Sequence, residues 1–192
     1  MAADVLVRNA WYVAGLAHEF PVQQLQGQVI AEKPLVMWRT TDGGVVAFDE
    51  RCCHKRMPLS RGRLIEGGLL ECPYHGLCYD ATGQCVRVPS HPDGHIPQGA
   101  RLRPFPINQQ DGLVWIWPGD PGKAGTVRPP RVPEIVDPMW DTADTGPMPV
   151  PAQHAAADRE PAGHYAFLPV ARRQHWRRRE QPHTDRDRRG DT

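Results

Sequence analysis

The residues of this chain that are best suited to chemistry form two short cysteine–histidine motifs. Residues 52–54 read CCH, a C-x-H motif, and after seventeen residues 72–75 read CPYH, a C-x-x-H motif. Each motif places one thiol and one imidazole a few positions apart, and both groups are common metal ligands. If the fold brings the two segments together, they offer two sulfur and two nitrogen ligands, from Cys52, His54, Cys72 and His75. We therefore expect a metal centre here.

Two kinds of metal centre fit this ligand set. One is a [2Fe–2S] cluster in which two thiolates hold one iron and two imidazoles hold the other. The other is a structural zinc site with two sulfur and two nitrogen ligands in a tetrahedron. Zinc sites more often pair like with like, as in C-x₂₋₄-C and H-x₃₋₅-H, whereas each motif here holds one ligand of each type. A third interpretation, small buried cysteines and surface histidines without a metal, fits poorly with two matched pairs.

The composition favours strands and turns in a cytoplasmic protein. The 192 residues include 21 Pro and 18 Gly, which favours short strands and many turns over long helices. The five cysteines fall between positions 52 and 85, and in a reducing compartment such clustering indicates metal binding rather than disulfides. The N-terminal residues lack the features of a signal peptide, and no apolar run approaches the roughly 18 residues of a membrane span. We expect no membrane partner.

Strand patterns predict an all-β architecture up to about residue 120. Three strands in a meander should lead into the first motif, and a brief strand should lead into the second. Glycine stands at turn positions in 41–44 (TDGG), 80–83 (DATG) and 110–112 (QDG), where positive φ is needed. The polar segment 52–63 contains Pro and Gly, so we expect a loop there. The predicted strands and extended segments are 11–17, 28–31, 34–39, 45–48, 69–71, 77–79, 85–88, 101–107 and 113–117.

The two motifs and their surroundings resemble a known family. The stretches RCCHKRMPLSRGRL and LLECPYHGLCYDATGQCVRVPS are similar to the Rieske domain of aromatic-ring oxygenases, including vanillate O-demethylase-like enzymes. The resemblance extends upstream to NAWYVAGLAHE and downstream to VWIWPGDP, and it covers roughly residues 8–140. It implies a Rieske-type antiparallel β-sandwich with two cluster-binding loops in residues 8–120, followed by a Pro-rich connection in 121–152 and a largely irregular tail in 153–192.

The resemblance also implies roles for the ligands and a kind of partner. Cys52 and Cys72 would hold the buried iron of one [2Fe–2S] Rieske cluster, and His54 and His75 would hold the outer iron. The electron donor would be a flavin/iron–sulfur reductase or a ferredoxin, and intact relatives form homo-oligomers. Rieske proteins of respiratory complexes carry two further cysteines joined by a disulfide. Those positions are Met57 and Tyr74 here, which favours the oxygenase branch with its lower potential.

The remaining cysteines and the charged residues near the motifs have simpler interpretations. We expect Cys53, Cys78 and Cys85 to be buried free thiols rather than further ligands. Basic residues around the first motif could form a rim that binds an acidic electron donor, although a solvated loop surface explains them equally well. These residues are Lys55, Arg56, Arg61 and Arg63.

The C-terminal part departs from the family pattern. Intact oxygenases of this kind continue into a catalytic domain whose helix carries D-x-x-H-x-x-x-x-H and holds a mononuclear Fe(II). Residues 152–192 instead hold nine Arg, no Lys and six acidic residues, with almost no aliphatic periodicity. Such a tail could be a disordered basic extension that contacts nucleic acid. We favour a different hypothesis and expect no nucleic-acid partner.

The tail reads as a frameshifted catalytic domain. With suitable synonymous codons from His154 onward, dropping one base gives MLLLIENLLDITHFYPLHDGNIG, which contains the missing D-x-x-H-x-x-x-x-H pattern. We therefore expect residues 153–192 to be out of frame. The function expected of this chain is the electron-transfer portion of an aromatic-ring hydroxylating or O-demethylating oxygenase, without oxygenation by this chain alone. The alternatives are a stand-alone Rieske ferredoxin and, more weakly, a zinc-binding module.

Overall fold

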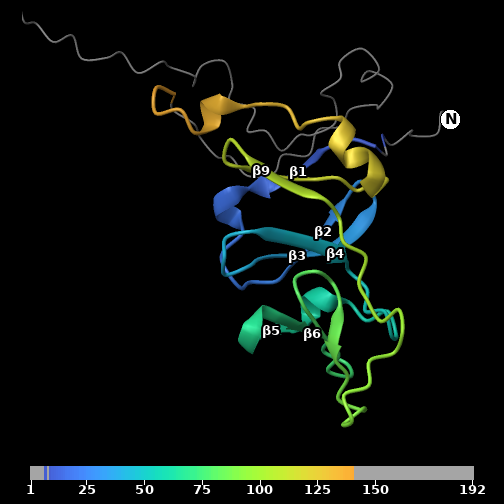
Figure 1. Ribbon diagram of the computed structural model, residues 1–192. Helices are drawn as coiled ribbons and strands as arrows, with labels where there is room; N and C mark the ends of the chain where they lie inside the picture. Colours follow the sequence, from blue (N-terminus) through green and yellow to red (C-terminus); the bar gives the residue numbers. More distant parts are fainter. Residues whose placement is uncertain (1–6, 8, 141–192) are drawn as a thin grey trace, which may run out of the picture.

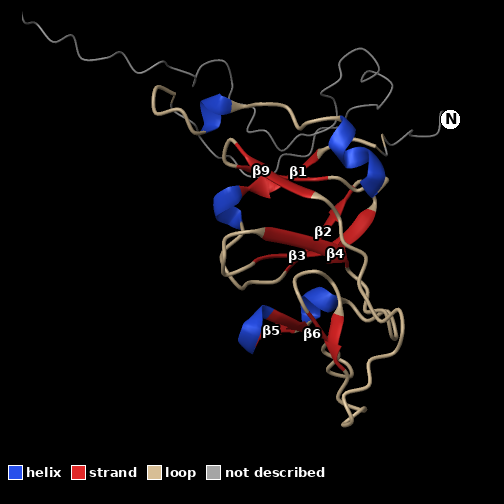
Figure 2. Cartoon of the chain, in the orientation of Figure 1, coloured by secondary structure: helices blue, strands red, loops and turns tan. Residues whose placement is uncertain are grey.

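The described part of the chain is built from short strands joined by loops. A computed structural model describes residue 7 and residues 9–140. The strands of this part form three antiparallel sheets, and its helices are single 3-10 turns or little longer. Figure 2 shows how few helical turns interrupt the strands and loops. The all-β prediction is confirmed.

The first sheet joins the beginning of the described chain to its later part. Strand β1 (Tyr12–Leu16) pairs with β10 (Leu113–Ile116), which also pairs with β9 (Ile107–Gln110). The β9–β10 hairpin turns at Asp111 and Gly112, whose φ angles are 52° and 75°. Positive φ at both central residues is what a two-residue hairpin turn of type I′ requires, and Asp-Gly is a favoured pair for it.

The second sheet is the predicted meander. Strands β2 (Gln26–Ile30), β3 (Lys33–Arg39) and β4 (Val45–Asp49) lie side by side in that order. The β2–β3 turn uses Ala31 and Glu32 with φ angles of 49° and 60°, although neither residue is glycine. The extensive pairing of β2 with β3 on either side of the turn offsets the strain of these two residues.

The third sheet surrounds the second cysteine–histidine motif. It has the order β5-β6-β7-β8, from β5 (Arg63–Ile65), β6 (Leu69–Glu71), β7 (Cys78–Tyr79) and β8 (Cys85–Arg87). Gly83 in the β7–β8 turn has a φ of 84°, and a Cβ there would lie 2.7 Å from the Phe48 ring. Glycine at this position therefore serves both the turn and the close packing of the turn against β4.

The helices are short connections between these strands. They lie between β1 and β2, on either side of β5, and after β10. None of the helices in residues 9–140 has the length and apolar character needed to cross a membrane. They are η1 (Ala17–Glu19), η2 (Leu59–Arg61), η3 (Glu66–Gly68), η4 (Pro121–Thr126) and η5 (Pro133–Ile135).

Strand β3 is buried on both faces and separates two hydrophobic cores. Because successive side chains point to opposite faces of a strand, Leu35 and Met37 enter one core while Val36 and Trp38 enter the other. The first core lies between the second sheet and the β1–β10–β9 sheet. The second lies between the second sheet and the part of the chain that carries both motifs. Figure 1 shows this layered order, with β1 and β9 above, β2–β4 in the middle and β5 and β6 below.

Residues after β10 pack back onto the first sheet. Val132 and Ile135 lie against a small core that includes Leu113. The Arg131 guanidinium binds the Asp111 carboxylate at 2.7 and 2.8 Å, and together with the Val132 N–H it holds the pKa of Asp111 below its usual value. The expected boundary at residue 120 stays a prediction. Residues 121–140 of the predicted connection are described, whereas residues 141–152 and the whole predicted tail lie outside the described residues.

The strand predictions are correct in outline and wrong in some details. The meander and the strand at 69–71 occur as predicted. The predicted loop 52–63 ends one residue early, because Arg63 begins strand β5, which the sequence pattern did not reveal. The predicted extended segment 101–107 makes only isolated bridges at Arg101 and Pro104 before β9 begins at Ile107. Short strands of this kind are set by their partners more than by their own pattern.

Candidate metal centre

Each cysteine–histidine motif lies in a six-residue loop that joins two antiparallel segments. We name residues 52–57 the first ligand loop and residues 72–77 the second ligand loop. The first is closed by the antiparallel bridge between Arg51 and Pro58. The second is closed by the pairing of Glu71 in β6 with Cys78 in β7. The two motifs therefore occupy equivalent positions in two hairpins of equal loop length.

The first ligand loop is fixed by two backbone hydrogen bonds. The Cys52 N–H donates to the Met57 carbonyl at 2.9 Å, and the Arg56 N–H donates to the Cys52 carbonyl at 2.9 Å. Arg56 has a φ of 55°, in the left-handed region that is costly for a residue with a Cβ. The reversal at this residue turns the chain back toward Pro58.

The second ligand loop repeats this pattern position by position. The Cys72 N–H donates to the Leu77 carbonyl at 2.8 Å, and the Gly76 N–H donates to the Cys72 carbonyl at 3.1 Å. Gly76, the fifth residue like Arg56 in the first loop, has a φ of 69°. Both loops thus start with cysteine and present a histidine two or three residues later on the same backbone frame.

The four predicted ligands lie together, with the thiols and the imidazoles in different surroundings. Cys52 and Cys72 are each 2% exposed and belong to the same hydrophobic core. The side chains of His54 and His75 are exposed, and their ring centroids are 4.7 Å apart. The structure therefore brings the four residues of the two motifs to one place, as a buried sulfur pair and an exposed nitrogen pair. Their role as ligands remains a prediction.

The electrostatic surroundings of Cys72 suit a sulfur that carries negative charge when it binds a metal. Burial raises the pKa of the Cys72 thiol, and the neighbouring Cys52 thiol adds to this increase. The backbone N–H groups of Tyr74 and His75 oppose it, because hydrogen bonds toward the sulfur favour the thiolate. Metal binding requires the deprotonated form, so these N–H groups are positioned to stabilise a ligand thiolate.

Tyr79 is a site residue that the sequence did not reveal. Its side chain is fully buried, and its hydroxyl oxygen lies 3.1 Å from Cys52 Sγ and 3.2 Å from Cys53 Sγ. Burial raises the pKa of the Tyr79 hydroxyl far above its usual range, and hydrogen bonding to the two thiols adds to the shift. The phenol therefore stays protonated and can donate a hydrogen bond to a metal-bound Cys52 thiolate. No motif marked Tyr79, because its importance depends on where β7 meets the first ligand loop.

A glutamate stands shortly before each loop, with different partners. Glu50 precedes the first loop, and its carboxylate accepts hydrogen bonds from the backbone N–H and the hydroxyl of Ser60. Its carbonyl also accepts from the Leu59 N–H at 3.1 Å. These contacts hold the two arms of the first hairpin together. The bonds from Ser60 are part-buried and go to a charged group, which makes them stronger than neutral hydrogen bonds.

The glutamate before the second loop forms ion pairs instead. The Glu71 carboxylate lies 2.6 Å from the Arg63 guanidinium and 2.9 Å from that of Arg87, which links β6 to β5 and β8. Both arginine side chains are largely exposed. Gly62 packs against the Glu71 backbone so closely that a Cβ at position 62 would lie 2.2 Å from the Glu71 carbonyl oxygen. This contact brings the end of the first hairpin against the start of the second loop.

The second loop is also held by a contact on its outer side. A Cβ added to Gly76 would lie 3.0 Å from Pro89 Cγ. Glycine is therefore favoured at position 76 both by the positive φ and by the proximity of the segment after β8. The corresponding residue of the first loop, Arg56, is exposed and accommodates a full side chain.

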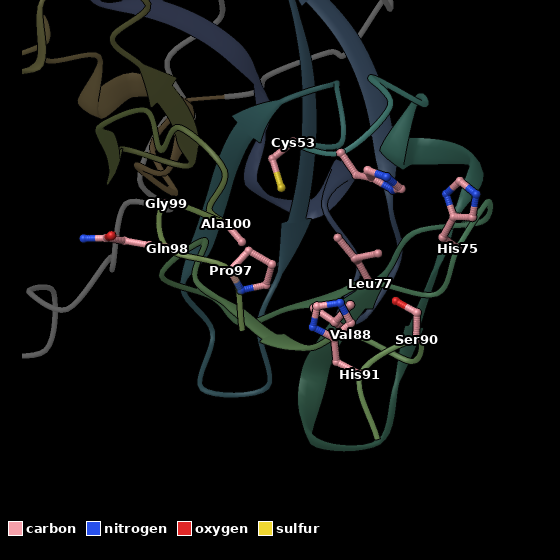
Figure 3. A pocket seen from close by; sticks show the side chains of 11 residues that line it. Cys53, His75, Leu77, Val88, Ser90, His91, Pro97, Gln98, Gly99 and Ala100 are labelled. Atoms are coloured by element: carbon pink, nitrogen blue, oxygen red, sulfur yellow. The ribbon is translucent and has the colours of Figure 1, made fainter. Parts of the chain in front are cut away.

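A pocket of about 550 Å³ opens beside the exposed imidazoles. It is lined by both histidines of the motifs, by Cys53 and by residues of the loop after β8, including Val88, His91 and Pro97. In Figure 3 the Cys53 sulfur points into the space between the surrounding labelled side chains. The expectation that Cys53 is a buried thiol is wrong, because the residue is exposed at the end of this pocket, whereas Cys78 and Cys85 are buried as expected. All five cysteines are free thiols.

The donor set fits a two-metal cluster better than a single ion. Two thiols at one end and two imidazoles at the other give each of two irons two protein ligands, which is the ligand arrangement of a cluster with mixed Cys and His ligation. A tetrahedral zinc site would need all four groups to converge on one point.

Comparison with known families agrees with this arrangement. The sequence model of the Rieske [2Fe-2S] domain matches residues 10–106, which include both ligand loops and all the strands except β9 and β10. The chain belongs to the Rieske domain family. The family resemblance seen in the sequence is thereby confirmed, as is the expectation of a [2Fe–2S] cofactor for this domain.

Several oxygenase components are similar to this Rieske domain. The chain is 45% identical over 139 residues to "Dicamba O-demethylase, oxygenase component" of Stenotrophomonas maltophilia, a match that covers 71% of this chain and 39% of the relative. It is 38% identical over 136 residues to a toluene-4-sulfonate monooxygenase system iron-sulfur subunit of Comamonas testosteroni, with 71% and 37% covered. The chain thus spans about two fifths of the length of these relatives.

A solved structure shows the same fold in this region. The crystal structure of dicamba monooxygenase with non-heme iron and dicamba has 44% sequence identity and a TM-score of 0.64. The match covers 72% of this chain and 41% of that one. The expected Rieske-type β-sandwich is therefore confirmed for the matched part of the chain.

Proposed function

We propose that this chain supplies the electron-transfer portion of an aromatic-ring hydroxylating or O-demethylating oxygenase. The observation that carries the proposal is the pair of equivalent ligand loops, which places two buried thiols and two exposed imidazoles side by side. The similarity to oxygenase components over most of the chain supports the proposal. Because the match covers only about two fifths of the length of these relatives, the activity of a whole oxygenase is a wider proposal than the electron transfer itself.

Each of the four ligands has a definite task in this proposal. Cys52 and Cys72 would hold the inner iron within the core, where water is excluded. His54 and His75 would hold the outer iron, and because a coordinating imidazole uses only one ring nitrogen, the other stays free at the surface. A [2Fe–2S] cluster bound by these residues supplies reversible one-electron transfer, at a higher potential than a cluster with four cysteine ligands. The exposed imidazole edges give electrons a short route in and out.

The electron donor in this proposal is a flavin/iron–sulfur reductase or a ferredoxin. The side chains of Lys55 and Arg56 are exposed in the first ligand loop, next to His54. Positive charge close to the exposed imidazoles would favour a donor with an acidic surface and would increase its rate of association. The free state of all five cysteines supports a reducing, cytoplasmic setting. Assembly into a homo-oligomer, in which electrons cross to another subunit, is part of the wider proposal.

The mononuclear Fe(II) of intact oxygenases is expected of the intact family and not of this chain. A two-histidine, one-carboxylate site needs three converging ligands, and residues 7 and 9–140 hold no such group. We therefore propose no aromatic substrate site for the Rieske domain itself. The hypothesis that residues 153–192 are out of frame is tested by the nucleotide sequence around codons 150–154. An intact second frame that encodes the missing motif supports the hypothesis, and a frame interrupted by stop codons contradicts it.

Anaerobic reconstitution tests the proposed electron-transfer function. The protein is incubated with iron and sulfide, desalted, and examined by visible absorption, metal analysis and EPR before and after reduction. The expected result is a coloured protein with about two irons and two sulfides per chain and an EPR signal that appears after reduction by one electron. A colourless protein that binds one zinc ion per chain instead would contradict the proposal and support the structural zinc alternative.

A further inference from the structure

The Tyr79 hydroxyl lies between two sulfur atoms that have different chemical roles. Cys52 Sγ, at 3.1 Å, belongs to a proposed ligand, and Cys53 Sγ, at 3.2 Å, belongs to the next residue, which has no proposed ligand role. Cys52 is buried, whereas Cys53 is exposed and lines the pocket beside the imidazoles. The phenol thus connects a buried ligand sulfur to a thiol at the surface.

The direction of these two hydrogen bonds follows from the number of protons available. A metal-bound Cys52 sulfur is a thiolate and can only accept, so the single Tyr79 O–H must donate to it. The Tyr79 oxygen is then free to accept, and the Cys53 thiol is the donor within reach. The result is a short chain in which Cys53 S–H donates to the Tyr79 oxygen and the Tyr79 O–H donates to Cys52 Sγ.

We propose that Cys53 is a positioning residue that raises the reduction potential of the cluster by acting through the Tyr79 hydroxyl. A hydrogen bond to a ligand sulfur withdraws electron density and stabilises the reduced, more negative state. Accepting a hydrogen bond from Cys53 polarises the Tyr79 O–H and strengthens its bond to Cys52. A thiol is a weak donor, so the contribution of Cys53 is smaller than that of the Tyr79 hydroxyl itself.

Because Cys53 is exposed, its side chain can be replaced without changing the core. Substitution of Cys53 removes the hydrogen-bond donor to the Tyr79 oxygen. It should therefore change the reduction potential of the cluster while the core that contains Cys52 and Tyr79 stays intact. Cys53 also adjoins His54, so the same surface that accepts the electron donor contains the group that adjusts the potential. The inference rests on the proposed electron-transfer function, because it concerns the potential of the cluster that this function requires.

The test is a set of reduction potentials measured on the reconstituted full chain. We compare wild type, Cys53→Ala, Cys53→Ser, Tyr79→Phe and the double variant Cys53→Ala/Tyr79→Phe by dye-equilibrated redox titration, followed by EPR. We expect a lower potential for Cys53→Ala, a larger decrease for Tyr79→Phe, and for Cys53→Ser a potential closer to wild type, because serine keeps a donor. The double variant should match Tyr79→Phe, because Cys53 has no effect without the hydroxyl.

A matched control and the contrary outcomes keep the inference separate from the proposed function. Cys85→Ala removes a thiol from the same core without touching the Tyr79 hydroxyl, and its potential should equal that of wild type. An unchanged potential in Cys53→Ala, or an equal decrease with and without the Tyr79 hydroxyl, would overturn the inference while leaving the cluster and the proposed function intact. If wild type itself assembles no cluster, the proposed function fails first and the inference fails with it.

Discussion

The two ligand loops have the same backbone and differ in almost every other respect. Both contain six residues, both are closed by two equivalent hydrogen bonds, and both reverse direction at a fifth residue with positive φ. The first has Arg56 at that position, is connected to Tyr79 and is anchored by part-buried hydrogen bonds. The second has Gly76, packs against Pro89 and is anchored by exposed ion pairs. The shared backbone conformation thus presents the ligands, while the contacts around each loop decide how much a substitution there destabilises the protein.

The largest effect should come from the cysteines, and it should be the same in both loops. Cys52→Ala and Cys72→Ala each remove one of the two sulfur ligands proposed for the inner iron, so we expect neither variant to assemble a [2Fe–2S] cluster. Iron and sulfide content with visible absorption measures the loss. Cys78→Ala, which changes a buried thiol outside both loops, should keep the cluster. Retention of a normal cluster by either ligand variant would contradict the assigned ligand set.

Substitutions at the fifth residue should change the stability of the protein differently in the two loops. Gly76→Ala introduces a Cβ at a φ of 69° and 3.0 Å from Pro89, so we expect the free energy of unfolding to fall by about 2 kcal/mol or more. Gly94→Ala is the matched control, because Gly94 has a φ of 77° and no atom within 4 Å of the added Cβ. Arg56→Gly relieves the positive φ in the first loop and should be close to neutral. Urea unfolding of the four proteins provides the comparison, and equal losses in Gly76→Ala and Gly94→Ala would show that contact with Pro89 is unimportant.

The glutamate before the first loop should matter more than a surface charge. Glu50→Ala leaves the Ser60 N–H and hydroxyl without their charged acceptor, so we expect a loss of about 1–3 kcal/mol in the free energy of unfolding. Glu66→Ala serves as the control, because Glu66 is exposed in η3 and removal of its charge should change stability by less than about 0.5 kcal/mol. Chemical unfolding curves decide the matter, and equal losses in the two variants would argue against anchoring by Glu50.

The glutamate before the second loop should give the smallest effect. Glu71 pairs with two arginine side chains that are 74% and 52% exposed, and exposed ion pairs contribute about 1 kcal/mol or less. We expect Glu71→Gln to destabilise the protein slightly at low salt and hardly at all at high salt, because salt screens exposed charges. Unfolding in urea at two salt concentrations measures this dependence. A loss as large as that of Glu50→Ala, and independent of salt, would show that the two anchors are equivalent.

Much of the fold was predictable because the strands carry local signals. The meander follows from apolar runs and a Thr-Asp-Gly-Gly turn, and β3 has a near-continuous apolar stretch because both of its faces are buried. The sequence did not reveal β5, which has three residues and exists through its pairing with β6. The predicted strands 28–31 and 34–39 left residues 32–33 for the β2–β3 turn, whereas Ala31 and Glu32 take positive φ because the flanking strands pair up to Ile30 and Lys33.

The sequence alone determined which groups the centre offers. The identity and spacing of Cys52, His54, Cys72 and His75 are covalent facts, and a short loop can present its own thiol and imidazole without reference to the rest of the chain. Only the tertiary structure decided the surroundings of those groups. It buried the thiols and exposed the imidazoles, brought the Tyr79 hydroxyl to Cys52, and left Cys53 at the surface. The physical reason is that burial and hydrogen bonding depend on residues more than twenty positions away, whose approach is set by how the sheets pack.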